Sequence, residues 1–113
     1  MIQKIDILGQ EYKLLKGNAK KYDSLNGADG FTDLYANKIV IDELLGTPEG
    51  GYKSENPTGV INRVYRHEVL HAFFKESGIS YKFSNDDEEF LVDWIAVQFP
   101  KLKKVFEEMG VSE

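Results

Sequence analysis

The chain contains no cysteine, which excludes disulfide bonds, cysteine-ligated zinc, iron–sulfur clusters and a thiol nucleophile. Basic side chains are outnumbered: 14 Lys and Arg stand against 19 Asp and Glu, giving a formal net charge of −5. This balance argues against nucleic acid or an anionic membrane as a partner. No segment approaches the roughly 18 apolar residues that a membrane-spanning helix needs, and the first residues lack the pattern of a secretion signal. We therefore expect a cytoplasmic protein.

Histidine is scarce as well, with two residues in a chain of 113. Length and composition otherwise predict a single globular domain over 1–113, because 42% apolar and 29% charged residues are ordinary for a folded, soluble chain. With only two imidazoles, any site that requires three histidine ligands is excluded. The position of the two histidines therefore decides which chemistry remains.

Short strands are expected in the first part of the chain, residues 1–45, where glycines interrupt the sequence often. Alternating or β-branched runs predict strands at 4–8, 11–16, 31–35 and 38–42. The run Ile39-Val40-Ile41 is the strongest of these signals, since β-branched side chains favour strands. A glycine-rich stretch, 46–56, follows and is expected to be a mobile loop.

Apolar residues at helical spacing dominate the second part. They predict helices over 57–77 and 85–99 and a short third helix over 101–109. Asn56 or Thr58 is expected to cap the first helix, Gly78 to follow its end and Pro100 to end the second. Together these elements predict an α+β domain: a short antiparallel sheet, or alternatively a mixed one, packed on the two long helices.

Both histidines lie in one string of five residues, His67-Glu68-Val69-Leu70-His71, which has the H-E-x-x-H pattern. On a helix, positions i and i+4 project from nearly the same side, so the two imidazoles can bind one metal ion. Glu68 lies about 100° around the helix from His67, where it can reach a water on the metal rather than the metal itself. The pattern therefore predicts a Zn²⁺ site with His67 and His71 as ligands.

A third protein ligand has to be a carboxylate, since no further histidine and no cysteine exists. The acidic cluster at the start of the predicted second helix can supply it. Glu89 and Asp93 are four residues apart and share a helix face, which favours Glu89 as the ligand and Asp93 as hydrogen-bond acceptor for a ligand histidine. Glu88 or Asp93 remains an alternative ligand. A solvated first turn that suits the helix dipole would explain Asp86 and Asp87, but it explains Asp93 poorly. Asp93 lies mid-helix among apolar residues, so we expect it to be buried and to need a partner such as a ligand histidine.

These residues resemble a known family. His67-Glu68-Val69-Leu70-His71 followed by Glu89-Phe90-Leu91-Val92-Asp93 is similar to the gluzincin arrangement of zinc metallopeptidases, H-E-x-x-H with a downstream E-x-x-x-D. Residues 66–78 and 93–99 also resemble small metallopeptidase-like proteins encoded by phages and prophages. The resemblance covers about residues 39–99.

The resemblance implies a zincin-like fold and hydrolysis of peptide bonds. Glu68 would be the general base on a zinc-bound water and would later protonate the leaving amine. The strand of Ile39, Val40 and Ile41 would pair with an extended peptide substrate. Tyr81 would donate a hydrogen bond to the oxyanion, with an ordinary packing role as its alternative.

Two functional hypotheses follow. The first is a minimal zinc metallopeptidase acting on a peptide or protein substrate. The second is a zinc-containing binding or regulatory module with little or no catalysis, self-blocked by the short third helix lying in the cleft. A weaker candidate for the oxyanion donor is Tyr52 in the 46–56 loop.

Overall fold

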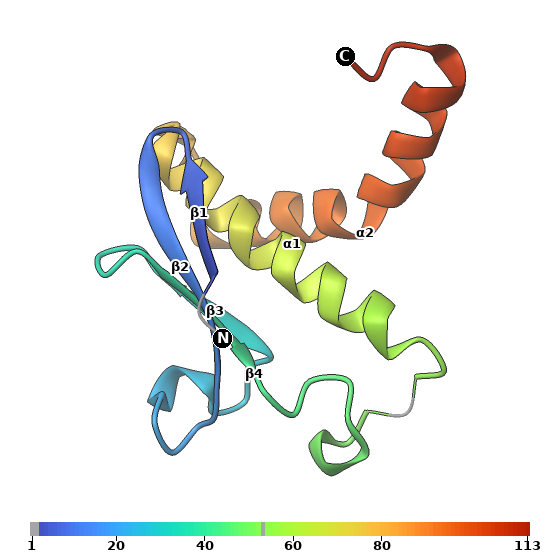
Figure 1. Ribbon diagram of the computed structural model, residues 1–113. Coiled ribbons are helices and arrows are strands. Elements are labelled where there is room, and N and C mark those ends of the chain that lie inside the picture. The colour runs from blue at the N-terminus through green and yellow to red at the C-terminus, as the bar shows by residue number, and fades with distance from the viewer. Residues whose placement is uncertain (1–2, 53) are drawn as a thin grey trace.

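The structure is a computed structural model that describes residues 3–52 and 54–113; residues 1, 2 and 53, which fall within the predicted strand region and loop, lie outside the described residues. A four-stranded sheet packs against two helices, which confirms the α+β fold class (Figure 1). Its strands are β1 (Gln3–Ile7), β2 (Gln10–Gly17), β3 (Gly30–Asp33) and β4 (Lys38–Asp42). The helices are α1 (Pro57–Glu76) and α2 (Asn85–Met109).

The sheet is mixed. Its strand order is β1-β2-β4-β3; both hairpins are antiparallel, whereas β2 and β4 pair in parallel at the centre. Residues 18–29 join the end of β2 to the start of β3 at the same end of the sheet, since Gly17 pairs with Asp42 and Gly30 with Ile41. The second hairpin then places β4 beside β2 and leaves β3 at the edge. The prediction of an antiparallel sheet is therefore wrong, and the alternative prediction of a mixed sheet is confirmed.

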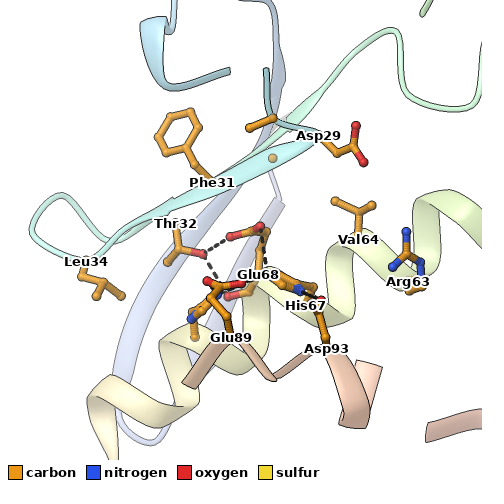
Figure 2. Close-up of a pocket in the computed structure, with 13 residues that line it drawn as sticks. Asp29, Phe31, Thr32, Leu34, Arg63, Val64, His67, Glu68, Glu89 and Asp93 are labelled. Carbon is orange, nitrogen blue, oxygen red and sulfur yellow. Dashed lines mark hydrogen bonds and ion pairs between the residues drawn. The ribbon is translucent and has the colours of Figure 1, made fainter. Parts of the chain in front are cut away.

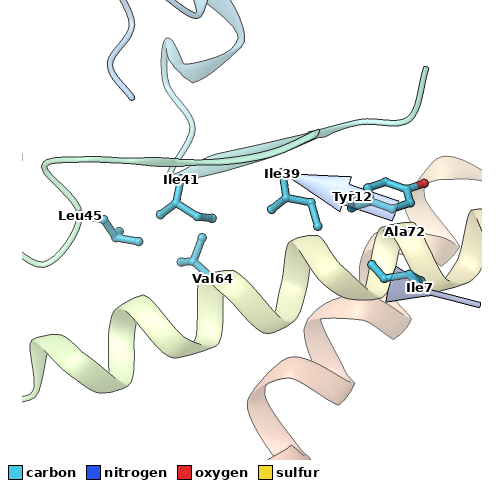
Figure 3. Packing of buried hydrophobic residues seen from close by; sticks show 7 residues of the cluster. All are labelled: Ile7, Tyr12, Ile39, Ile41, Leu45, Val64 and Ala72. Atoms are coloured by element: carbon cyan, nitrogen blue, oxygen red, sulfur yellow. The ribbon is translucent and has the colours of Figure 1, made fainter. Parts of the chain in front are cut away.

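The apolar core lies between one face of the sheet and α1 (Figure 3). Successive side chains of a strand point to opposite faces, so Ile39 and Ile41 of β4 face the helix. They pack with side chains from both hairpins and from α1; the buried cluster is Ile7, Tyr12, Ile39, Ile41, Leu45, Val64 and Ala72. Gly30, at the start of β3, admits a close approach: a Cβ there would lie 2.9 Å from Ile41 Cδ1 and 3.3 Å from Val64 Cγ1.

Helix α1 begins and ends close to where its sequence predicts. The side chain of Asn56 accepts a hydrogen bond from the Gly59 amide, and Pro57 occupies the first turn. Gly78 follows the helix with a φ of 80°, a left-handed conformation that glycine adopts readily. A 3-10 turn, Ile79–Lys82, then leads to α2.

Helix α2 is continuous from Asn85 to Met109, so the prediction of two helices, 85–99 and 101–109, is wrong. Pro100 lies inside it. Proline removes one backbone hydrogen bond and crowds the preceding turn, which kinks a helix when the flanking turns still form. Figure 1 shows α2 turning sharply part way along, after which its last turns rise away from the sheet and α1.

The predicted loop at 46–56 contains a 3-10 turn, Pro48–Gly50, capped by Thr47; its mobility stays a prediction. Within the described part of the chain, no helix is long and apolar enough to cross a membrane.

Candidate metal centre

Helix α1 presents two neighbouring stripes of side chains. Val64, Glu68 and Ala72, spaced four residues apart, are buried against the sheet. His67 and His71 lie one position earlier on each turn and face the first turns of α2. The first turn of α2 is held by Ser84, whose hydroxyl accepts a hydrogen bond from the Asp87 amide at 3.1 Å.

The two imidazoles and one carboxylate converge on a single point. His71 Nε2 lies 2.8 Å from Glu89 Oε1, and His67 Nε2 lies 3.3 Å from Glu89 Oε2. The two Nε2 atoms are 3.2 Å apart. One ligand atom from each of the three residues thus falls within 4.8 Å of the others, close enough to hold one metal ion.

The other nitrogen of each ring is held by a second carboxylate. His67 Nδ1 lies 2.7 Å from Asp93 Oδ1, and His71 Nδ1 lies 2.7 Å from Glu88 Oε2. A carboxylate accepts hydrogen bonds and does not donate them, so each ring can donate its Nδ1–H to the carboxylate beside it when its Nε2 atom binds a metal ion. This tautomer leaves the Nε2 lone pairs pointing at Glu89, the arrangement that metal-ligating histidines show in proteins.

The donor set therefore fits a divalent cation. In the tautomer with the proton on Nδ1, the two Nε2 atoms and the Glu89 carboxylate are all acceptors. Acceptors crowded within about 3 Å of one another repel unless a positive charge lies between them. Two imidazoles and one carboxylate also match the ligands of catalytic zinc, which keeps its fourth position open.

Glu68 is the one charged residue buried in the described part of the chain, with 7% of its surface exposed. The Thr32 hydroxyl on β3 lies 2.9 Å from both its Oε1 and its backbone carbonyl oxygen, so its single proton is shared between them. The other oxygen, Oε2, lies 3.9 Å from His67 Nε2. Burial raises the pKa of the Glu68 carboxyl, while the Thr32 hydrogen bond and the nearby imidazoles oppose that rise.

A pocket of about 510 Å³ opens over this cluster, between α1, α2 and β3 (Figure 2). The metal-ligand candidates and Glu68 form one side, and Gly30, Phe31 and Thr32 of β3 form the other. Acidic groups outnumber basic ones here: among the described lining residues, Arg63 alone carries a fixed positive charge.

The structure brings together most of the residues singled out in the sequence: His67, Glu68, His71, Glu89 and Asp93. Glu88 and Asp93, the alternative third ligands, instead lie on the Nδ1 sides of the rings. The argument that Asp93 would be buried is wrong, since 56% of its side chain is exposed. Its expected partner, a ligand histidine, is nevertheless present.

The two tyrosines predicted as oxyanion donors do not lie at the site. Tyr81 is 90% exposed in the 3-10 turn before α2 and does not line the pocket. Tyr52 packs at the edge of the core and donates a hydrogen bond to Asp29, so its hydroxyl is already paired. Neither tyrosine is placed to act as the oxyanion donor.

The prediction that Ile39, Val40 and Ile41 pair with a substrate is also wrong. β4 is hydrogen-bonded on both sides, to β2 and β3, and all three side chains are buried. A strand with both edges paired has no free backbone groups to offer to a peptide. The β-branched run that predicted a strand so strongly marks the centre of the sheet rather than its edge.

Two contributors escaped the sequence reasoning. Thr32 lies far from the H-E-x-x-H string and comes beside Glu68 only through the packing of β3 on α1. The sequence predicts Glu88 as an alternative ligand, whereas the structure makes it the partner of His71. A signal for it existed: Glu88 and Glu89 are adjacent, and so project about 100° apart and can reach opposite sides of one ring.

A scan against protein-family models and searches of curated proteins and of solved structures find no match to this chain. The resemblance to gluzincins therefore stays a prediction that rests on the motif residues alone.

Proposed function

We propose that the chain is a zinc-dependent metallopeptidase that hydrolyses peptide bonds. The observation that carries the proposal is the convergence of three residues: two imidazoles with Asp93 and Glu88 at their Nδ1 atoms present both Nε2 atoms to Glu89. Zinc fits this set better than calcium or magnesium, because those ions prefer oxygen ligands alone. His67, His71 and Glu89 would hold the ion, which supplies Lewis-acid chemistry toward water and the peptide carbonyl.

Glu68 is the proposed general base. It lies beside the three candidate ligands and is not one of them. Thr32 donates a hydrogen bond to its Oε1, and its Oε2 faces the His67 ring. A carboxylate in this position accepts a proton from the attacking water and returns it to the leaving amine. A pKa raised by burial suits both steps, because the group then binds the proton more readily than an exposed carboxylate would.

We propose that β3, and not β4, is the strand that pairs with the substrate. Within the described residues, β3 pairs only with β4, so its other edge is open, and three of its residues line the pocket. An extended peptide added to that edge would run past Glu68 and the ligand histidines. A peptide or protein substrate in extended conformation is therefore the proposed substrate class.

The test measures bound metal and peptide cleavage together. Wild-type protein loaded with zinc should bind one ion per chain and cut unfolded peptides in a mixed library, read by mass spectrometry. Glu68→Gln should keep the zinc and lose about 10²- to 10⁴-fold of the cleavage rate, as expected when a general base is removed.

Asp86→Asn is the matched control, because it removes one negative charge from the exposed first turn of α2 at a residue that does not line the pocket. It should retain both zinc and activity. Undiminished cleavage by Glu68→Gln would refute the mechanism, and a wild-type protein that binds no zinc would refute the site.

A second candidate is a zinc-bearing binding or regulatory module with little catalysis. It is favoured by one observation: none of the described lining residues is a tyrosine or a third histidine that could donate to an oxyanion. Self-blockage by residues 101–109 has no support, because none of them lines the pocket. Stoichiometric zinc with no cleavage of any peptide would favour this candidate.

A further inference from the structure

The last turns of α2, beyond Pro100, carry an exposed apolar stripe. Val105 is 49% exposed, Phe106 44% and Met109 66%. With Leu102, these residues recur at spacings of three and four, which places them on one side of the helix. Figure 1 shows this segment rising away from the sheet and α1. Large apolar side chains in such a place mark a surface that meets another molecule.

The charges around the stripe are arranged symmetrically. Lys103 and Lys104 precede Val105, and Glu107 and Glu108 follow Phe106, while Lys101 lies outside this arrangement. The centre of the pattern falls between Val105 and Phe106. When a second copy of the segment runs antiparallel about that centre, the stripes meet and each copy's lysines lie beside the other's glutamates. A parallel, in-register pair would instead place like charges at the same level.

The end of the helix is electrostatically unfavourable in one chain. Glu107 and Glu108 lie in the last turn, next to the negative pole of the helix dipole, and that turn contains no basic residue. A 3.9 Å contact between Lys103 and Glu107 offsets this only weakly, since both side chains are largely exposed. Lysines from a second, antiparallel copy would supply the missing positive charge.

We propose that this segment, residues 101–109, is a homodimerisation surface at which two chains pair their α2 ends antiparallel. The occupant is a second copy because the stripe is complementary to itself in both apolar spacing and charge order. A pair of such short helical segments buries less area than a standard stable interface, so the dimer is weak. We expect half-association at about 10–100 µM chain concentration, at the weak end of specific interfaces.

Sedimentation equilibrium from about 1 µM to 1 mM tests the proposal. Wild type should pass from monomer to dimer over this range. The double variants Lys103→Glu/Lys104→Glu and Glu107→Lys/Glu108→Lys should each weaken self-association at least about tenfold, because the facing charges become alike. Lysine and glutamate have similar helix propensities, so both variants should keep the wild-type circular dichroism spectrum.

A one-to-one mixture of the two double variants is the decisive measurement. One variant then has only glutamates at positions 103, 104, 107 and 108, and the other has only lysines there. The mixture should therefore form a heterodimer over the same range of chain concentration in which wild type dimerises. Phe106→Ala tests the stripe independently and should also weaken the dimer.

Three results would overturn the proposal. They are a wild type that stays monomeric at 1 mM, a dimer that none of the variants weakens, and variants that fail to pair with each other.

Discussion

The two stripes of side chains on α1 differ in how deeply they are buried and in what they contact. The stripe of Val64, Glu68 and Ala72 packs into the core, and the side chain of its polar member accepts a hydrogen bond from Thr32. The neighbouring stripe of His67 and His71 is only partly buried, yet each ring contacts carboxylates at both nitrogens. The apolar members of the first stripe therefore secure the helix to the sheet, whereas Glu68 and the two histidines present polar atoms to the pocket.

Because of this difference, substitutions can change the stability of the fold and the binding of a metal ion separately. Removing a methyl group from the core stripe costs transfer free energy and leaves a cavity, without touching a ligand atom. Removing a group from the histidine stripe costs little packing and abolishes a ligand or its orientation. Variants of the histidine stripe should thus change zinc affinity, and variants of the apolar residues facing the sheet should change the free energy of unfolding.

The largest effect is expected for the proposed ligands. His71→Ala and Glu89→Ala should each lower zinc affinity by roughly 10³-fold, because a three-ligand site loses one full metal bond. Competition with a chelator measures this, with Asp86→Asn as the control that should bind like wild type. If Glu89→Ala binds normally while Glu88→Ala does not, the third ligand is Glu88.

A smaller effect is expected for the carboxylates that hold the rings. Glu88→Gln and Asp93→Asn should lower zinc affinity about 10- to 100-fold, since each orients a ligand histidine at the same distance of 2.7 Å. Glu88→Gln should have the larger effect, because its side chain is 16% exposed and that of Asp93 56%. The reverse order, measured in the same assay, would mean that burial does not govern these contacts.

On the sheet-facing stripe, the expected change is in folding. Val64→Ala should lower the free energy of unfolding by about 1–2 kcal/mol, from lost burial and a small cavity. Urea denaturation in the presence of a chelator isolates this loss from metal binding. Zinc affinity should stay within about threefold of wild type. Val97→Ala, at a half-exposed position of α2, should change neither quantity.

The smallest effect concerns a contact at the far end of α1. Burial raises the pKa of Tyr12 above its ordinary value near 10, and the hydrogen bond that Tyr12 donates to Glu76 raises it further. The folded protein therefore favours the protonated phenol, so this stabilisation is complete below pH 10 and is lost as the pH rises above it.

Tyr12→Phe should lower the free energy of unfolding at neutral pH by about 1 kcal/mol, the value of one such hydrogen bond. The difference between wild type and variant should shrink as the pH rises from 9 to 11. Urea denaturation at several pH values measures it. A difference that grows over that range would show that Tyr12 is not protonated in the folded state.

Much of the site could be predicted because it depends on local spacing. Asn56 and Ser84 mark helix starts through their side chains, and Gly78 marks a helix end through its backbone. The four-residue interval of the histidines sets their common direction on any helix. The same interval relates Glu89 to Asp93. For this reason the candidate ligand set and the α+β class could both be read from the order of residues.

The errors concern questions that local spacing cannot decide. Pro100 is compatible with a helix end or with a kink, and the choice depends on whether the turns beyond it form. A β-branched run such as 39–41 favours a strand wherever it lies, but not its place within the sheet. Tyr81 lies in the expected connection, yet its side chain points to solvent.

The sequence by itself determined that the two imidazoles share one side of α1 and that Glu89 and Asp93 share one side of α2, because helix geometry converts residue spacing into direction. Only the tertiary structure decided which oxygen meets which nitrogen, that Thr32 supports Glu68, and that β3 rather than β4 borders the pocket. The physical reason is that those contacts join residues distant in the chain, and they form only when the sheet and both helices pack together.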